Sequence, residues 1–139
     1  MTTTRSSLPA SAQYARIGFR ILNVLFSICI AVQVFLAGFA LFVDSAQWGM
    51  HGHFALYLAP ISVLLFILSF PARLPKGIKI KSLVLIGLIL LIFATAVFSE
   101  EIGFAAAAHP VISLGLFLNA MLIMRDNENE RIEERRQRI

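Results

Sequence analysis

The sequence predicts an all-α protein: a four-helix transmembrane bundle with an up-down-up-down course and both termini in the cytoplasm. Three observations lead to this fold. Hydrophobic residues make up 58% of the 139 residues and charged residues only 14%, whereas a soluble domain carries about 25% charged residues. Four long apolar stretches alternate with short polar ones. Lys and Arg occur at the start of the first stretch, between the second and third, and after the fourth. One domain is expected at this length.

Each apolar stretch is long enough to cross a bilayer, which takes roughly 20 mostly apolar residues in a helix. The spans are placed at about residues 17–43, 50–70, 80–98 and 103–124. Together they form a single transmembrane domain over residues 15–125. The first is too long for the apolar part of a signal peptide, so we predict that it is retained. Residues 1–14 are expected to be disordered, and residues 126–139 to form a charged cytoplasmic tail.

The basic residues predict the orientation of the spans. Lys and Arg precede the first span, fill the connection between the second and third, and follow the fourth. The other two connections carry only Asp44, Glu100 and Glu101 as charged residues. By the positive-inside rule both termini are cytoplasmic, and the protein's three histidines lie toward the outer side. The lipid bilayer is the expected partner. The basic residues of the tail can contact anionic lipid headgroups, although a solvated tail without a partner is the favoured interpretation. No nucleic-acid partner is expected.

Small and polar residues recur within the spans. The small ones form stripes at helical spacing, which favour close approach of helices inside the bundle or to a partner: Ser27, Ala31, Gly38, Ala55, Ala59 and Ser62. Asn23 and Asn119 are expected to form hydrogen bonds between helices near the cytoplasmic side. Gln33 lies nearer the middle of the membrane, where it can line a cavity.

The histidines fall into two groups by helical face. His51 shares its face with Ala55, one turn deeper in the second span. His109 has Ser113 at the same spacing in the fourth span. His53 is rotated roughly 200° from His51 and is expected toward the rim of the bundle. His51 and His109 therefore share a pattern, in which a histidine is followed by a small residue one turn below.

This pattern suits a flat macrocycle, whose plane must pass close to the helix beside the ligand. Imidazole is an established axial ligand of haem, and cofactor sites commonly lie between facing helices of a bundle. We therefore predict haem b bound between the second and fourth helices near the outer face, for electron transfer or redox sensing. His51 and His109 are the candidate ligands, and Ala55 and Ser113 leave room for the ring.

Two other interpretations remain open. The three histidines His51, His53 and His109 can also form a small metal site for zinc or copper. Alternatively they are hydrogen-bonding residues at the membrane surface of a non-catalytic accessory or structural subunit. Such a subunit would associate with a membrane-protein partner, or with copies of itself, through its small-residue faces. Pro110 disfavours helical geometry at His109, which can then cap a helix instead. No catalytic motif is found, so enzymatic activity is unsupported.

Three segments, VQVFLAGFALF, WGMHGHFALYL and HPVISLGLFLNAMLI, resemble a family of small four-helix bacterial membrane proteins of unassigned function. Its Q-x-x-L-A-G element matches residues 33–38. Its histidine with glycine four residues later matches His51, although Ala55 stands in place of the glycine. Its His-Pro element matches His109 and Pro110. The resemblance implies a multi-pass protein of the bacterial cytoplasmic (inner or plasma) membrane. A more distant similarity to b-type cytochrome bundles implies haem bound through the same two histidines.

Overall fold

The computed structural model describes residues 8–136 and is all-α, with no strand in that range. The all-α prediction is therefore confirmed. The helices are α1 (Ala10–Phe42), α2 (Trp48–Leu68), α3 (Lys76–Val97), α4 (Ser99–Ile102) and α5 (His109–Arg136). Two short 3-10 turns, Ser45–Gln47 and Gly103–Ala108, precede α2 and α5. Four helical segments in the described range are long and apolar enough to cross a membrane.

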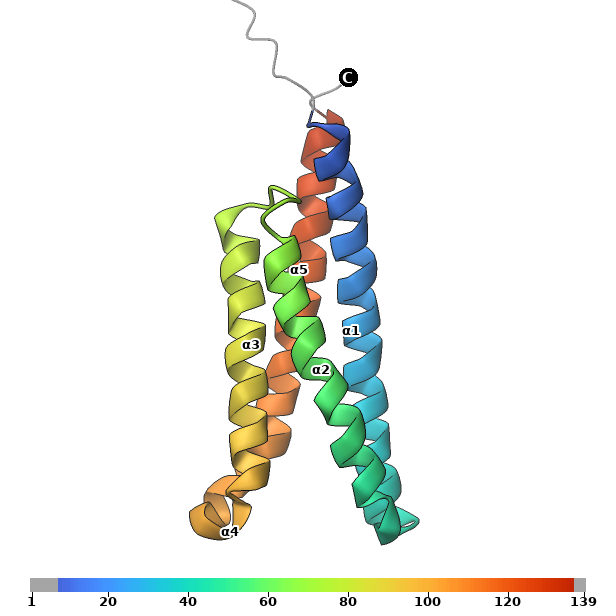
Figure 1. Ribbon diagram of the computed structural model, residues 1–139, viewed down its shortest axis with the longest axis vertical. Helices are drawn as coiled ribbons and strands as arrows, with labels where there is room; N and C mark the ends of the chain where they lie inside the picture. Colours follow the sequence, from blue (N-terminus) through green and yellow to red (C-terminus); the bar gives the residue numbers. More distant parts are fainter. Residues whose placement is uncertain (1–7, 137–139) are drawn as a thin grey trace, which may run out of the picture.

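Consecutive long helices run antiparallel and enclose a common axis (Figure 1). Helix α1 packs against α2 and α5, and α3 packs against the same two helices. Helices α2 and α5 make no close backbone approach to each other within residues 8–136. They are therefore the diagonal pair, facing each other across the centre of the bundle.

Helices α1 and α5 extend beyond the other two at the end that carries both termini (Figure 1). The expectation of disorder over residues 1–14 is wrong for residues 10–14, which form the first turns of α1, and residues 126–136 continue α5. The remainder of both predicted segments lies outside the described residues. Arg16 explains the pairing of the two extensions, because it forms an ion pair with Glu134. It also donates to the carbonyl oxygens of Ala72, at 2.9 Å, and Arg73, at 3.1 Å.

The fourth long helix begins later than the sequence indicates. Residues 103–108 form a 3-10 turn, and α5 starts at His109. Gly103 has a φ of +54°, a conformation that residues with a side chain rarely adopt. Pro110 then occupies the first turn of α5, where its missing N–H leaves no helical hydrogen bond unmade. His109 is thereby placed at the very start of the helix.

Hydrogen bonds between helices involve the two asparagines as expected. Asn23 donates to the carbonyl oxygen of Ala120, at 3.1 Å, and links α1 to α5. Asn119 donates to the carbonyl oxygen of Lys81, at 2.8 Å, and links α5 to α3. Both predicted bonds are confirmed. They lie in the half of the bundle that also carries Arg16, Arg20 and Arg125, which we call the basic end.

The packed core also belongs to the basic end and the middle of the bundle. Its large buried side chains include Phe19, Phe26, Leu65, Leu85 and Ile123, and it reaches toward the other end as far as these residues: Ile30, Leu58, Ile89 and Leu116. Beyond that level, toward His51 and His109, the buried residues of the described chain are only Ala40 and Thr95. We call this part the histidine end. Fewer of its side chains are fully buried.

Exposed apolar residues cover the outside of the long helices. Phe35, Leu56, Leu90 and Leu118 are each more than half exposed, one on each long helix. Soluble monomers rarely expose apolar surface on this scale, whereas lipid is a matching environment. The small-residue stripe of α1 does not form one buried face, because Ser27 is buried and Ala31 is exposed.

Candidate functional site

His51 and His109 face each other inside the histidine end. Their ring centroids are 6.4 Å apart, and the ring planes are inclined by 55°. His51 lies in the first turn of α2, and His109 is the first residue of α5. Since these two helices are the diagonal pair, the rings meet across the centre of the bundle. Residues far apart in sequence thus form one site.

Two residues hold the His51 ring. Its Nδ1 lies 3.2 Å from the backbone carbonyl oxygen of Gln33. The side-chain amide of Gln33 in turn donates to the carbonyl oxygen of His51, at 2.8 Å. Trp48 packs its ring edge-on against His51, with centroids 5.6 Å apart. A carbonyl oxygen can only accept, so Nδ1 of His51 carries the proton and Nε2 keeps its lone pair.

The His109 ring is held in the same tautomer by Thr95. Its Nδ1 lies 3.0 Å from Oγ1 of Thr95. That hydroxyl already donates its single proton to the carbonyl oxygen of Ile92, at 2.8 Å. With its proton on the Ile92 carbonyl, the hydroxyl accepts from Nδ1 of His109, and in this tautomer the neutral ring has its lone pair on Nε2. In metal-binding histidines, a hydrogen bond of this kind at one ring nitrogen orients the other nitrogen toward the metal.

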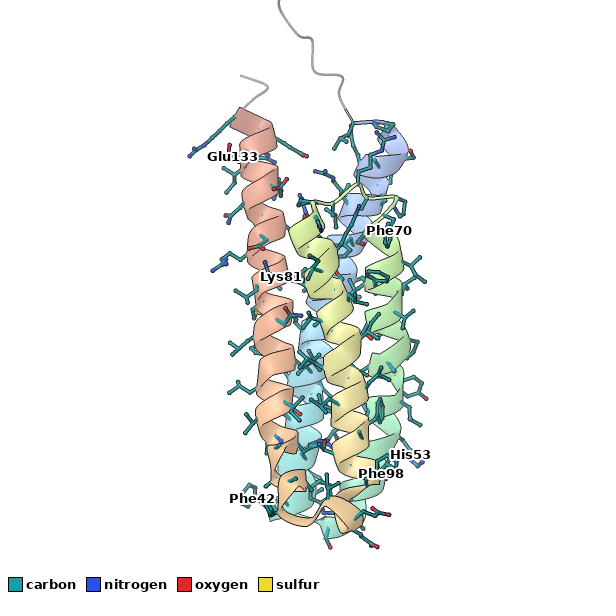
Figure 2. The ribbon with its side chains drawn as sticks, turned by 90° about the vertical axis from the view of Figure 1, so that its left-hand side faces the viewer. Phe42, His53, Phe70, Lys81, Phe98 and Glu133 are labelled. Carbon is teal, nitrogen blue, oxygen red and sulfur yellow. The ribbon has the colours of Figure 1, made fainter. Side chains whose placement is uncertain are left out.

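His53 does not join the other two histidines. It is exposed and projects from α2 away from the neighbouring helices (Figure 2). Within residues 8–136, no group of three or more His, Cys, Asp or Glu side chains is arranged to hold a metal ion. The structure thus brings together His51 and His109 of the proposed metal set and leaves His53 outside it.

The two small residues predicted below the histidines are both half-buried. The hydroxyl of Ser113 donates to the carbonyl oxygen of His109, at 2.9 Å, so this hydrogen bond lies within α5. Ala55 lies one turn below His51 on α2. Because both side chains are small, they project little from the helices below the two rings. The sequence did not link Gln33 or Thr95 to the histidines, although each is a polar residue in an apolar span.

The site presents hydrogen-bond acceptors. Hydrogen bonds engage Nδ1 of both rings, so each histidine has Nε2 to offer. The side-chain oxygen of Gln33 is buried and has no partner within the described residues. An unpaired buried acceptor is costly unless a donor or a cation meets it. The arrangement therefore suits an electron-pair acceptor such as a metal centre.

Residues 33–98 match the model of DUF6220, a family of unknown function. The match covers just under half of the chain and is consistent with the expected uncharacterised family. It includes Gln33, His51 and Thr95 and ends before His109. No curated protein and no solved structure shows significant similarity to the chain.

Proposed function

We propose that this protein is a multi-pass membrane protein that binds haem b between His51 and His109. One observation carries the proposal: two imidazoles from diagonally opposite helices lie 6.4 Å apart, and each has its Nδ1 tied by a hydrogen bond. The sequence pattern that first suggested the pair is independent of this geometry.

The number and spacing of the ligands favour haem over a bare metal ion. Metal–imidazole bonds are about 2 Å long, so two imidazoles on opposite sides of one metal have centroids roughly 6 Å apart. Structural zinc sites take four protein ligands, and no third ligand joins these two histidines among the described residues. A haem iron takes four ligands from its macrocycle and needs only axial ligands from the protein. Two histidines are then a complete set.

The surroundings also suit a planar group. The packed core ends below the site, and the helix surfaces next to the rings carry Ala55 and Ser113. When bound, haem supplies one-electron redox chemistry. The chain's own part is to orient the two rings through Gln33 and Thr95 and to surround the site with apolar residues.

The distribution of Lys and Arg supports a position for the histidine site on the outer side of the membrane. Lys and Arg gather at the basic end, and the positive-inside rule supports a cytoplasmic position for both termini. The histidine end then lies at the outer face of the cytoplasmic membrane. Trp48 beside His51 fits this level, because tryptophan is enriched at membrane interfaces. We infer electron transfer or redox sensing at the outer leaflet.

The test is an absorbance spectrum of the protein purified in mild detergent from a haem-replete host, before and after dithionite reduction. We expect a Soret band with sharp reduced α and β bands. His51→Ala and His109→Ala should each remove the six-coordinate spectrum, whereas the control His53→Ala should keep it. Pigment that survives in both ligand variants would refute the ligand assignment. A protein that stays colourless after incubation with haemin would overturn the haem proposal and leave the accessory role.

A further inference from the structure

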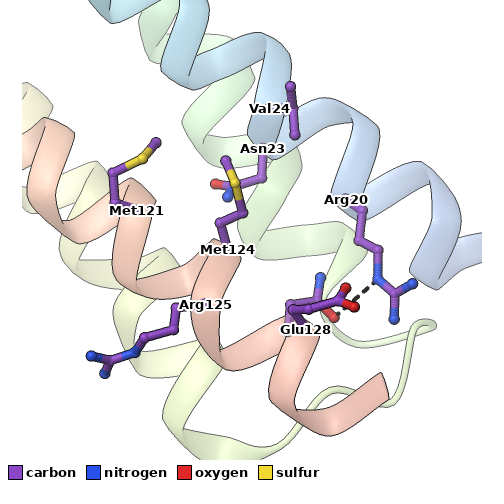
Figure 3. Close-up of a pocket in the computed structure, with 8 residues that line it drawn as sticks. Arg20, Asn23, Val24, Met121, Met124, Arg125 and Glu128 are labelled. Carbon is purple, nitrogen blue, oxygen red and sulfur yellow. Dashed lines mark hydrogen bonds between the residues drawn. The ribbon is translucent and has the colours of Figure 1, made fainter. Parts of the chain in front are cut away.

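A second site lies at the basic end, at the opposite end of the bundle from the histidines. A cavity of about 460 Å³ is situated between α1 and α5 (Figure 3). Its lining includes Arg20, Asn23, Val24, Met121, Met124 and Arg125. Val24 and Arg125 are exposed, so the cavity is open to the surroundings of the bundle.

The lining changes from apolar to charged along the direction of the membrane normal. Val24 and Met121 lie toward the middle of the spans. Arg20 is one turn nearer the basic end on α1, and Arg125 is one turn nearer on α5, which runs antiparallel to it. Both arginines stand where the long apolar runs of their helices end. The cavity therefore has an apolar part at acyl-chain depth and a cationic part at headgroup depth.

The arginines are available to an anion. Arg20 donates through Nε to Oδ1 of Asn127, at 3.5 Å, and this is its only hydrogen bond among the described residues. Its two terminal nitrogens can therefore take a phosphate in a fork. Among the described residues, the one ion pair of Arg125 is with the neighbouring Asp126, at 3.4 Å. Glu128 also lines the cavity, and the three ionisable groups leave a net charge of +1.

The positive charge continues along the same groove. A smaller cavity of about 200 Å³ shares Arg20 with the first cavity. Its lining also includes Arg16, Arg131, Arg135 and Glu134. Basic pockets between membrane helices are suited to anionic lipid headgroups. A soluble anion would use the arginines but would have no use for Val24, Met121 and Met124. The combination of both parts favours a lipid.

We propose that this cavity binds one anionic phospholipid, such as phosphatidylglycerol, from the leaflet at the basic end. The phosphate is bound by Arg20 at one side of the cavity, Arg125 adds positive charge from the other side, and an acyl chain packs over Val24, Met121 and Met124. This site does not depend on the haem proposal, since it shares no residue with the histidine end.

The test uses the full chain in nanodiscs of equal parts phosphatidylglycerol and phosphatidylcholine, released for native mass spectrometry. The mass of the retained lipid identifies it. We expect one phosphatidylglycerol to dominate, and its ratio to phosphatidylcholine to fall about fivefold for each arginine removed in R20Q and R125Q. The control K76Q/K79Q removes two charges from the same end outside the cavity, and it should leave the ratio unchanged.

A second variant tests the acyl-chain part without altering charge. Met124→Trp fills the cavity and should lower the retained lipid severalfold, with helix content unchanged by circular dichroism. Equal retention of both lipids by the wild-type protein would overturn the proposal. So would equal losses in R20Q/R125Q and K76Q/K79Q, because general surface charge would then explain the preference. Full retention in Met124→Trp would refute the acyl-chain position.

Discussion

The basic end and the histidine end of the bundle use their polar residues differently. At the basic end, polar side chains join one helix to another, as Asn23 and Asn119 do through backbone carbonyls. Buried apolar side chains surround these bonds. At the histidine end, Gln33 and Thr95 also join one helix to another, and their contacts there include the rings of His51 and His109. Few side chains are fully buried there.

Asn23 at the basic end and Gln33 at the histidine end each keep one buried side-chain oxygen without a partner among the described residues. The two ends therefore differ mainly in how many side chains are fully buried. Functional sites are commonly the places where local packing rules are broken and the remainder of the fold compensates. Substitutions at each end test this difference.

The largest effect is expected from removing core volume near the basic end. Phe26 is fully buried, so Phe26→Ala should lower the free energy of unfolding by about 3–5 kcal/mol through lost contacts and a residual cavity. The matched control is Phe42→Ala at the far end of the same helix, where the side chain is 83% exposed. It should be nearly neutral. Reversible unfolding in mixed micelles measures both. Similar losses in the two variants would contradict the concentration of stability at the basic end.

A smaller effect is expected from the ion pair that joins the helix extensions. Arg16 is buried and serves Glu134 and two backbone carbonyls at once. Arg16→Ala should cost about 2–3 kcal/mol, less than a fully buried pair because Glu134 is partly exposed. On the same extension, Arg136 and Glu133 form an exposed pair, so Arg136→Ala should stay within about 0.5 kcal/mol. An equal cost for both, in the same unfolding measurement, would show that the extensions add no stability.

Much of the fold could be predicted because membrane spans are a local property of the chain. About 20 apolar residues suffice to indicate a span, whatever it packs against. The ends of α1 and α5 could not be placed in this way. Residues 10–14 are helical beside a facing extension, and this pairing depends on Arg16 reaching Glu134, 118 positions away. The late start of α5 was signalled by Pro110, which favours a helix beginning there.

In the candidate site too, the sequence predicted what local spacing determines and not what depends on how the helices are arranged. Helical spacing placed His51 and His53 on different faces, as the structure has them. The meeting of the two rings needed the relative heights of α2 and α5. The acceptor for His109 depends on how the connection 98–108 sets α3 against α5, and periodicity carries no such information. A polar residue at similar depth on an adjacent span was the one available signal, and Thr95 is that residue.

The smallest expected effect concerns this acceptor. Thr95→Val removes the oxygen that receives the Nδ1 proton of His109, while its shape is nearly unchanged. If haem binds as proposed, its affinity should fall about 10- to 100-fold, as for other partners of metal-binding histidines. Thr95→Ser keeps the hydroxyl and should bind like the wild-type protein. Haem titration followed at the Soret band measures both. Equal affinity in all three proteins would show that Thr95 does not position the ring.

Helix α5 connects the histidine end of the molecule to the basic end. It runs unbroken for 28 residues from His109 to Arg136, about 42 Å at 1.5 Å per residue. Pro110 stands in its first turn and its one glycine is Gly115. A tilt of about 5° around its midpoint displaces each end by about 2 Å. One continuous helix thus connects the ring of His109 to the pairing of Glu134 with Arg16.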